Sequence, residues 1–224
     1  MLRLGRAAAI AVAACLLLTT AQQASATSKG ACPGYSKAIL APAMESFWRW
    51  NLGGGPQNVG PLFMVPLPAG EPVSDDPYIT QGSESFSVRV GRILVLPLTF
   101  WLGESYDDGT SDDPADWPFD FKASRVLLKV DGRVVVDSNR TKLDCLFVPP
   151  TYFRKPIDYA EPTDYGSVAA EWMNGLGILL PPLPPGQHVI DLQVESPVPG
   201  ELLDYFGFSG FGYFNTWHVT VTRK

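Results

Sequence analysis

The stretch RVLLKVDGRVVVD, residues 125–137, gives the clearest indication of how this chain folds. Two short runs rich in Val and Leu flank the dipeptide Asp131-Gly132. β-Branched residues favour strands. Asp-Gly is favoured in a two-residue type I′ turn, in which both central residues have positive φ. The stretch therefore predicts a β-hairpin with its turn at Asp131-Gly132.

More strands are expected on both sides of this hairpin. From Glu84, residues 84–90 alternate between apolar and polar side chains, which is typical of a half-buried strand. Residues 93–102 are apolar in a denser run that Pro97 interrupts, and this predicts a bulge or a sheet edge there. Further strands are predicted for residues 176–180, 188–195 and 213–222.

One helix is predicted, over residues 42–52. Pro42 suits a first helical turn, and Gly53 suits the position just past the end. One helix with six or seven strands, and no regular alternation of the two, argues against a parallel α/β sheet. We therefore expect a mainly β protein, an antiparallel β-sandwich of jelly-roll or Ig-like type with one short N-terminal helix.

The first 26 residues have the three parts of a signal peptide. Arg3 and Arg6 precede an unbroken apolar run of 12 residues, 7–18, and the segment ends in Ala24-Ser25-Ala26. A membrane-spanning helix needs about 20 apolar residues, so the run is too short for an anchor. We predict cleavage after Ala26, one domain over residues 27–224, and a secreted or periplasmic location.

The mature chain is acidic. Removal of Arg3 and Arg6 leaves 15 basic against 23 acidic side chains, a net charge of −8. Nucleic-acid binding depends on neutralising phosphates, so this composition argues against a nucleic-acid partner. No later stretch is long and apolar enough for a transmembrane segment.

Cleavage also leaves an even number of cysteines. Cys15 departs with the signal peptide, and Cys32 and Cys145 remain. In an oxidising compartment such a pair most simply forms one disulfide. A catalytic Cys145 or a zinc site are the alternatives, but the two histidines, His188 and His218, show neither a suitable motif nor a ligand spacing.

Several stretches together resemble a group of uncharacterised secreted bacterial proteins. They are WRW at residues 48–50, VGRILVLP at 90–97, the hairpin around Asp131-Gly132, LLPPLPPGQHVI at 179–190 and the final strand with WHVTV. The resemblance implies export and a β-sandwich. It implies no activity, so function has to be argued from a site.

An acidic loop is the first candidate site. It carries six carboxylates within 13 residues, starting at Glu104. Crowded carboxylates repel one another, and a hard cation such as calcium relieves that repulsion. A solvated loop without metal is the favoured interpretation, and a calcium site and a carboxylate pair for glycoside hydrolysis are the alternatives. The candidate calcium ligands are Asp107, Asp108, Asp112, Asp113 and Asp116.

Aromatic side chains form the second candidate site. Residues 205–214 combine aromatic residues with glycines, and flat aromatic faces can stack on sugar rings or pack in a core. Side chains that join a flat face to a hydrogen-bonding group are the best ligand-binding candidates: Trp101, Trp117, Tyr205, Tyr213 and Trp217. For the pair Glu171-Trp172, a core tryptophan is favoured over a catalytic acid with raised pKa.

Three functions follow. No nucleophile elbow, phosphate-binding loop or dinucleotide-binding motif occurs in the sequence. The favoured hypothesis is a non-catalytic secreted domain that binds carbohydrate or another cell-surface ligand and needs no cofactor beyond a structural calcium. The alternatives are a hydrolase or lyase that attacks extracellular polysaccharide through paired carboxylates, and a structural or interaction protein of the envelope.

Overall fold

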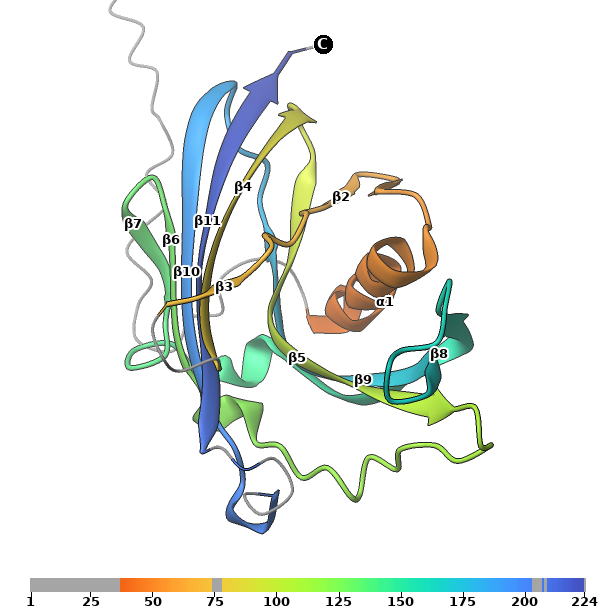
Figure 1. Cartoon of the computed structure of the whole chain (residues 1–224). Coiled ribbons are helices and arrows are strands. Elements are labelled where there is room, and N and C mark those ends of the chain that lie inside the picture. Colours follow the sequence, from red (N-terminus) through yellow and green to blue (C-terminus); the bar gives the residue numbers. More distant parts are fainter. Residues whose placement is uncertain (1–36, 74–77, 203–206, 208, 224) are drawn as a thin grey trace, which may run out of the picture.

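The computed structural model describes residues 37–73, 78–202, 207 and 209–223, and these residues form one α-helix and two mixed β-sheets (Figure 1). The elements in chain order are α1 (Lys37–Gly53), β1 (Asn58–Val59), β2 (Leu62–Met64), β3 (Glu71–Pro72), β4 (Ile79–Arg89), β5 (Ile93–Tyr106), η1 (Phe121–Ala123), β6 (Arg125–Val130), β7 (Arg133–Asp137), η2 (Leu143–Cys145), β8 (Phe147–Asp158), β9 (Ser167–Leu180), β10 (Gly186–Pro197), η3 (Gly200–Leu202) and β11 (Gly210–Thr222).

The strands divide into a five-stranded and a six-stranded sheet. The five-stranded sheet has the order β1-β2-β5-β9-β8, and the six-stranded sheet has the order β3-β4-β11-β10-β6-β7. The mainly β class is confirmed, but the all-antiparallel prediction is wrong. The pairs β2–β5 and β4–β11 are parallel. The two strands of each of these pairs are not joined by a hairpin, so no tight turn forces them to run antiparallel.

Two local predictions are confirmed. Asp131 and Gly132 have φ values of 50° and 73°, as a type I′ turn requires, and Val130 pairs with Arg133. Pro97 lies at a bulge, because the pairing of β5 with β9 changes register between Pro97 and Thr99. A proline inside a sheet is tolerated at such a position since no ladder hydrogen bond is lost.

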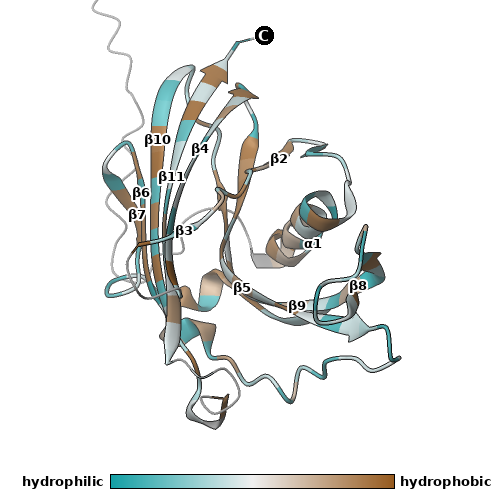
Figure 2. Ribbon diagram, in the orientation of Figure 1, coloured by the Kyte–Doolittle hydropathy of each residue, from teal (hydrophilic) through white to brown (hydrophobic). Residues whose placement is uncertain are grey.

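The largest core fills the space between the two sheets. Leu94, Leu96 and Leu98 of β5 meet Ile190 and Trp217 of the six-stranded sheet in one buried cluster. Hydrophobic and hydrophilic residues alternate along β10 and β11 (Figure 2), whereas β5 is continuously apolar over residues 93–98, because both of its faces are covered. Burial of one such side chain stabilises the fold by about 1.5–3 kcal/mol.

The helix α1 covers the other face of the five-stranded sheet. Met44 and Phe47 are fully buried against residues such as Val95 and Met173, whose side chains point away from the six-stranded sheet. Figure 1 shows β5 and β9 curving beneath the helix. The molecule therefore has three layers, with the five-stranded sheet in the middle.

The helix differs from its prediction at both ends. It already includes Lys37, so Pro42 lies inside the helix and not at its start. It ends with Gly54 at φ 66°, and the Gly55 N–H donates to the Arg49 carbonyl at 3.0 Å. The left-handed Gly54 ends the helix, one residue later than the glycine predicted for that position.

The sequence patterns missed β8 and the first half of β9. β8 has prolines and charged residues in a mostly exposed strand, so it shows no clean apolar alternation. The proposed signal peptide lies outside the described residues. Among the helices that are described, none has the length and apolar character needed to cross a membrane.

Candidate functional site

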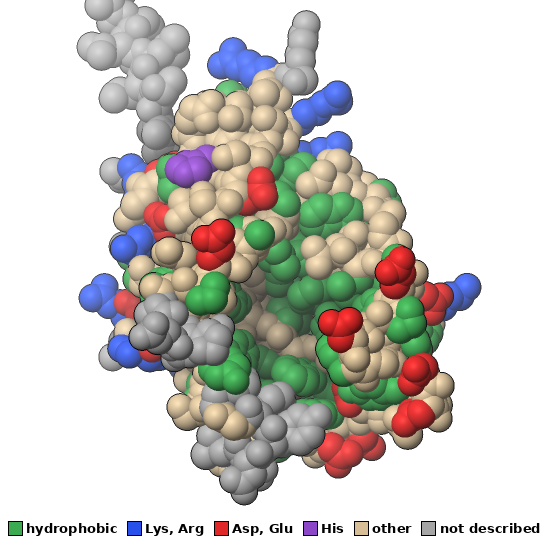
Figure 3. All heavy atoms as spheres, viewed as in Figure 1, with side chains coloured by type: hydrophobic (Ala, Val, Ile, Leu, Met, Phe, Trp, Pro, Cys, Tyr) green, Lys and Arg blue, Asp and Glu red, His purple; other side chains and the backbone are tan. Residues whose placement is uncertain are grey.

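A hydrophobic groove opens between the six-stranded sheet and α1. Figure 3 shows hydrophobic side chains gathered in this hollow. Its volume is about 260 Å³. Five segments contribute its lining: Trp48 from α1, Leu67, Pro68 and Gly70 from the chain after β2, Thr80 from β4, Pro97, Thr99 and Phe100 from β5, and Phe211, Tyr213 and Asn215 from β11.

The groove exists because β2 is short. β2 pairs with β5 only along residues 93–95, so it does not cover the part of β5 that includes Pro97 and Phe100. The chain after β2 crosses instead to the six-stranded sheet. There the Trp217 indole N–H donates to the Pro66 carbonyl at 2.6 Å. This bond helps to hold one wall of the groove in place.

Aromatic rings face the groove from both sides. Trp48 and Phe100 contact each other edge to face, with centroids 5.8 Å apart. Phe211 and Tyr213 line the groove from the six-stranded sheet. The Trp48 indole N–H is buried and has no hydrogen-bond partner among the residues that the structure describes. An unmet buried donor costs about 1–3 kcal/mol.

A chain of hydroxyl groups continues inward from the groove. Burial raises the pKa of the Tyr213 phenol, and its hydrogen bond with Thr99 opposes the shift only in part. The Thr99 Oγ1 lies 3.2 Å from the Ser196 Oγ, which lies 2.9 Å from the Ser124 Oγ. These hydroxyls satisfy one another, and the phenol stays neutral at physiological pH.

No charged side chain is among the described residues that line the groove. A charged ligand group would therefore lose its hydration without gaining an ionic partner there, which costs several kcal/mol. The groove consequently fits a neutral ligand, or the neutral part of one.

The structure scatters the aromatic residues that the sequence singled out. Tyr213 lies in the groove. Trp217 is fully buried in the core and its N–H is used by Pro66, so its proposal as a ligand-binding residue is corrected. Trp101 and Trp117 do not line the groove. Their rings stack on each other, with centroids 5.1 Å apart. Tyr205 lies outside the described residues.

The acidic loop uses its carboxylates within itself. Asp108 accepts from the Thr110 N–H and hydroxyl, and Asp113 accepts from the Ala115 N–H. Asp112 accepts from the Glu104 N–H. In the described part of the chain, no three acidic, histidine or cysteine side chains gather into a metal-binding group. The calcium site therefore stays a prediction, beside the solvated loop that the sequence favoured.

Neither the groove nor the hollow beside Asp137 combines paired carboxylates with aromatic walls among its described lining residues. The groove has no carboxylate among those residues. A second hollow has Asp137 and Glu195 but no aromatic ring among its described lining residues. Glu104 accepts a hydrogen bond from the Tyr159 hydroxyl. Burial is the main cause of the raised pKa of that phenol, and the bond to Glu104 adds to it. Glu171 neighbours Trp172, which is fully buried as favoured.

Cysteine and histidine have structural surroundings. Cys145 ends η2 and is not a free thiol, which argues against its catalytic alternative. Cys32 lies outside the described residues, so its pairing with Cys145 stays a prediction. His188 is buried and bonded to Asp131, whereas His218 is exposed on the face opposite Trp217.

Sequence reasoning missed Trp48 and Phe100 as site residues. Both looked like core aromatics, and the only available signal was the concentration of aromatics in the WRW segment of the helix. Comparison with known proteins adds no further assignment, since no family model, curated protein or solved structure matches this chain.

Proposed function

We propose that this protein is a non-catalytic binding domain, and that the groove binds a neutral, mainly apolar ligand. The observation that carries the proposal is an uncharged groove with four aromatic rings, opening between two structural layers. Ligand sites in proteins are concave and mostly apolar, with a few polar groups that fix orientation. Here Thr80 and Asn215 would supply that orientation.

The lining favours an apolar ligand over a sugar in this groove. Each sugar hydroxyl that enters an apolar site needs a hydrogen-bond partner, because an unmet one costs about 1–3 kcal/mol. The groove offers only a few polar side chains, and the hydroxyl of Thr99 already contacts that of Ser196. An acyl chain or a flat ring with one polar end matches this distribution better.

The wider setting of the protein belongs to the same proposal. Export by cleavage after Ala26, a secreted or periplasmic location and a bacterial origin are supported by the composition of the first 26 residues and by the resemblance. A jelly-roll or Ig-like type is proposed for the sandwich. The absence of a carboxylate from the groove supports a binding role over the hydrolase alternative.

A neutral fluorescent probe tests the groove. The mature protein, residues 27–224, is titrated with N-phenyl-1-naphthylamine, and the bound probe is displaced with a neutral fatty alcohol. Saturable binding is expected. Leu67→Arg should weaken it by about tenfold, because the new charge lies at the rim of the apolar site. Leu67 is 36% exposed, so this variant should fold normally.

One further variant alters the groove, and another serves as a control outside it. Phe100→Ala removes an aromatic wall and should weaken probe binding similarly, whereas Tyr152→Ala changes an exposed side chain of β8 and should leave it unchanged. Circular dichroism checks the fold of each variant. The proposal is lost if the wild type shows no saturable binding, or if Leu67→Arg and Phe100→Ala both bind as the wild type does.

A further inference from the structure

The outer face of the six-stranded sheet carries an ordered array of side chains on three neighbouring strands. Strand pairing places residues of β6, β10 and β11 side by side in rows. We call these nine positions the outer-face array. Its three rows are Lys129–Asp191–Thr216, Leu127–Gln193–Phe214 and Arg125–Glu195–Gly212.

The array is hollowed along its length. Hollows of about 150 and 230 Å³ lie over it, and a third of about 390 Å³ opens at its end, where Ser196 and Phe211 also line it; the hollows share lining residues. Leu127 and Gln193 line the first two, and Arg125 and Glu195 line the last two. The shared residues make one trough of adjoining hollows along β10. Rows two residues apart on a strand are about 6.6 Å apart, so the trough suits an extended chain.

Gly212 keeps the wide end of the trough open. A Cβ at this position would meet the Val194 carbonyl oxygen at 2.7 Å, so the close approach of β10 and β11 requires glycine here. Gly212 is itself buried and lines the widest hollow beside Glu195, with no side chain that projects into it. An extended ligand could therefore lie close to the sheet at this end.

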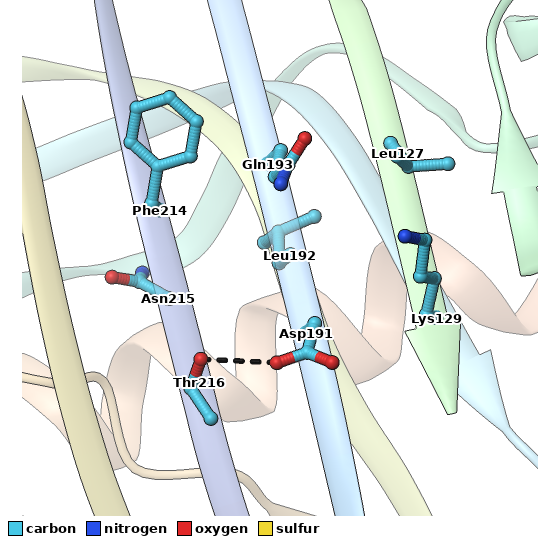
Figure 4. A pocket seen from close by; sticks show the side chains of 8 residues that line it. All are labelled: Leu127, Lys129, Asp191, Leu192, Gln193, Phe214, Asn215 and Thr216. Atoms are coloured by element: carbon cyan, nitrogen blue, oxygen red, sulfur yellow. Dashed lines mark hydrogen bonds between the residues drawn. The ribbon is translucent and has the colours of Figure 1, made fainter. Parts of the chain in front are cut away.

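The chemistry of the array is polar but neutral overall. Two basic residues, Arg125 and Lys129, are balanced by Asp191 and Glu195, and Arg125 lies 3.4 Å from Glu195. Asp191 also accepts from the Thr216 hydroxyl at 3.0 Å, as Figure 4 shows. The balance of charges gives no preference for a polyanion or a polycation.

The middle row offers a different pair of properties. The Gln193 side chain is exposed and can both donate and accept hydrogen bonds. It lies between Leu127 and Phe214, and Phe214 is 37% exposed (Figure 4). A flat aromatic face beside an amide suits a sugar ring, whose C–H face is apolar and whose edge carries hydroxyls.

We propose that the outer-face array binds a strand of neutral polysaccharide. Phe214 contacts the face of a sugar ring, Gln193 bonds ring hydroxyls, and the paired charges of the outer rows bond hydroxyls further along the chain. Phe214, which would contact the sugar, lies on the face of β11 opposite the groove residue Tyr213, and Phe211 is shared by the groove and the widest hollow of the trough. The protein would then hold a polymer on one face and an apolar ligand within.

The test measures retention of the mature protein by immobilised polymers. Affinity electrophoresis is run in gels that contain a neutral β-glucan, a neutral α-glucan or a neutral galactomannan, and in gels with the polyanion pectate. Retention by at least one neutral polymer is expected. Phe214→Ala and Gln193→Ala should each weaken that retention by about tenfold.

The controls separate this site from the groove. Ser85→Ala alters an exposed residue of β4 on the same sheet but outside the array, and should be retained like the wild type. Phe100→Ala alters the groove and should also be retained. The proposal is overturned if no neutral polymer retains the wild type, if only pectate does, or if both array variants migrate as the wild type does.

Discussion

A single buried histidine fastens the best-predicted hairpin to the rest of its sheet. The His188 Nδ1 lies 2.7 Å from an Asp131 carboxylate oxygen, and the Nε2 lies 2.8 Å from the Pro184 carbonyl. The other Asp131 oxygen accepts from the Val189 N–H. Because both ring nitrogens face acceptors, the doubly protonated imidazolium fits this site. Asp131 therefore both forms part of the turn and bonds to His188 and Val189. We call this set of bonds the clasp.

The clasp makes stability depend on pH. Burial alone would lower the pKa of His188, but its bonds to Asp131 and Pro184 outweigh burial and raise it. Burial alone would raise the pKa of Asp131. Its hydrogen bonds with His188 and Val189 outweigh burial and lower that pKa. The histidine contribution is full below its ordinary value of 6.5 and is lost as pH rises through the raised pKa. The aspartate contribution is full above 3.8 and is lost as pH falls through the lowered pKa.

Asp131→Asn should therefore destabilise the protein most between these two values. Asparagine tolerates positive φ, so the turn itself should survive. We expect a loss of about 1 kcal/mol or less near pH 5, because the carboxylate is half exposed and water screens it. The loss should shrink at higher pH. Urea unfolding across pH measures it, with Asp158→Asn as an exposed control, and an equal loss at every pH would contradict the charge interpretation.

Gly103 gives a steric prediction at the same scale. A Cβ there would lie 1.8 Å from the Trp172 indole, which is fully buried. Gly103→Ala should cost about 2–3 kcal/mol or more, since a packed core has no space to yield. Gly200→Ala is the matched control, because no atom lies within 4 Å of its Cβ position. Thermal unfolding compares the two, and equal midpoints would show that Trp172 moves freely.

At the level of elements, local sequence determined some strands and distant packing determined others. The hairpin of β6 and β7 was predictable because its turn residues and both strands lie within one short stretch. β8 was not, since its side chains are mostly exposed and its strand pairs with β9 through two register shifts. The parallel pairing of β4 with β11 joins residues more than 100 positions apart. No local pattern encodes such a contact.

The helix α1 depends on packing more than on its own sequence. Pro42 lies within it, which removes an intrahelical hydrogen bond, so contact with the five-stranded sheet has to hold it. Phe47→Ala should destabilise the protein by about 3–5 kcal/mol, because the ring is fully buried. Ile39→Ala, at a position 44% exposed on the same helix, should cost little. Chemical denaturation measures both, and similar losses would contradict this account.

At the scale of the whole molecule, the candidate groove could not be read from the sequence. Its walls come from α1, β4, β5, β11 and the chain after β2, and only the tertiary fold brings these together. The aromatic residues were visible in the sequence, but only the structure shows which of them are buried in the core and which line the groove. Tyr213 reached the groove, whereas Trp217 became core. In the acidic loop, Asp108 and Asp113 accept hydrogen bonds from nearby backbone N–H groups, and the spacing of the carboxylates alone does not specify these contacts.

The cysteines carry the last prediction, which concerns the connection of the chain start to its middle. A Cys32–Cys145 bond would close a loop of about 113 residues. A disulfide typically stabilises the folded state by about 2–4 kcal/mol, because it lowers the entropy of the unfolded chain. Cys145→Ser should lower stability by that amount, and Cys32→Ser by the same amount. Because both substitutions remove one shared bond, the double variant should lose no more than either single one. Urea unfolding tests this equality, and additive losses would mean that the two cysteines act separately.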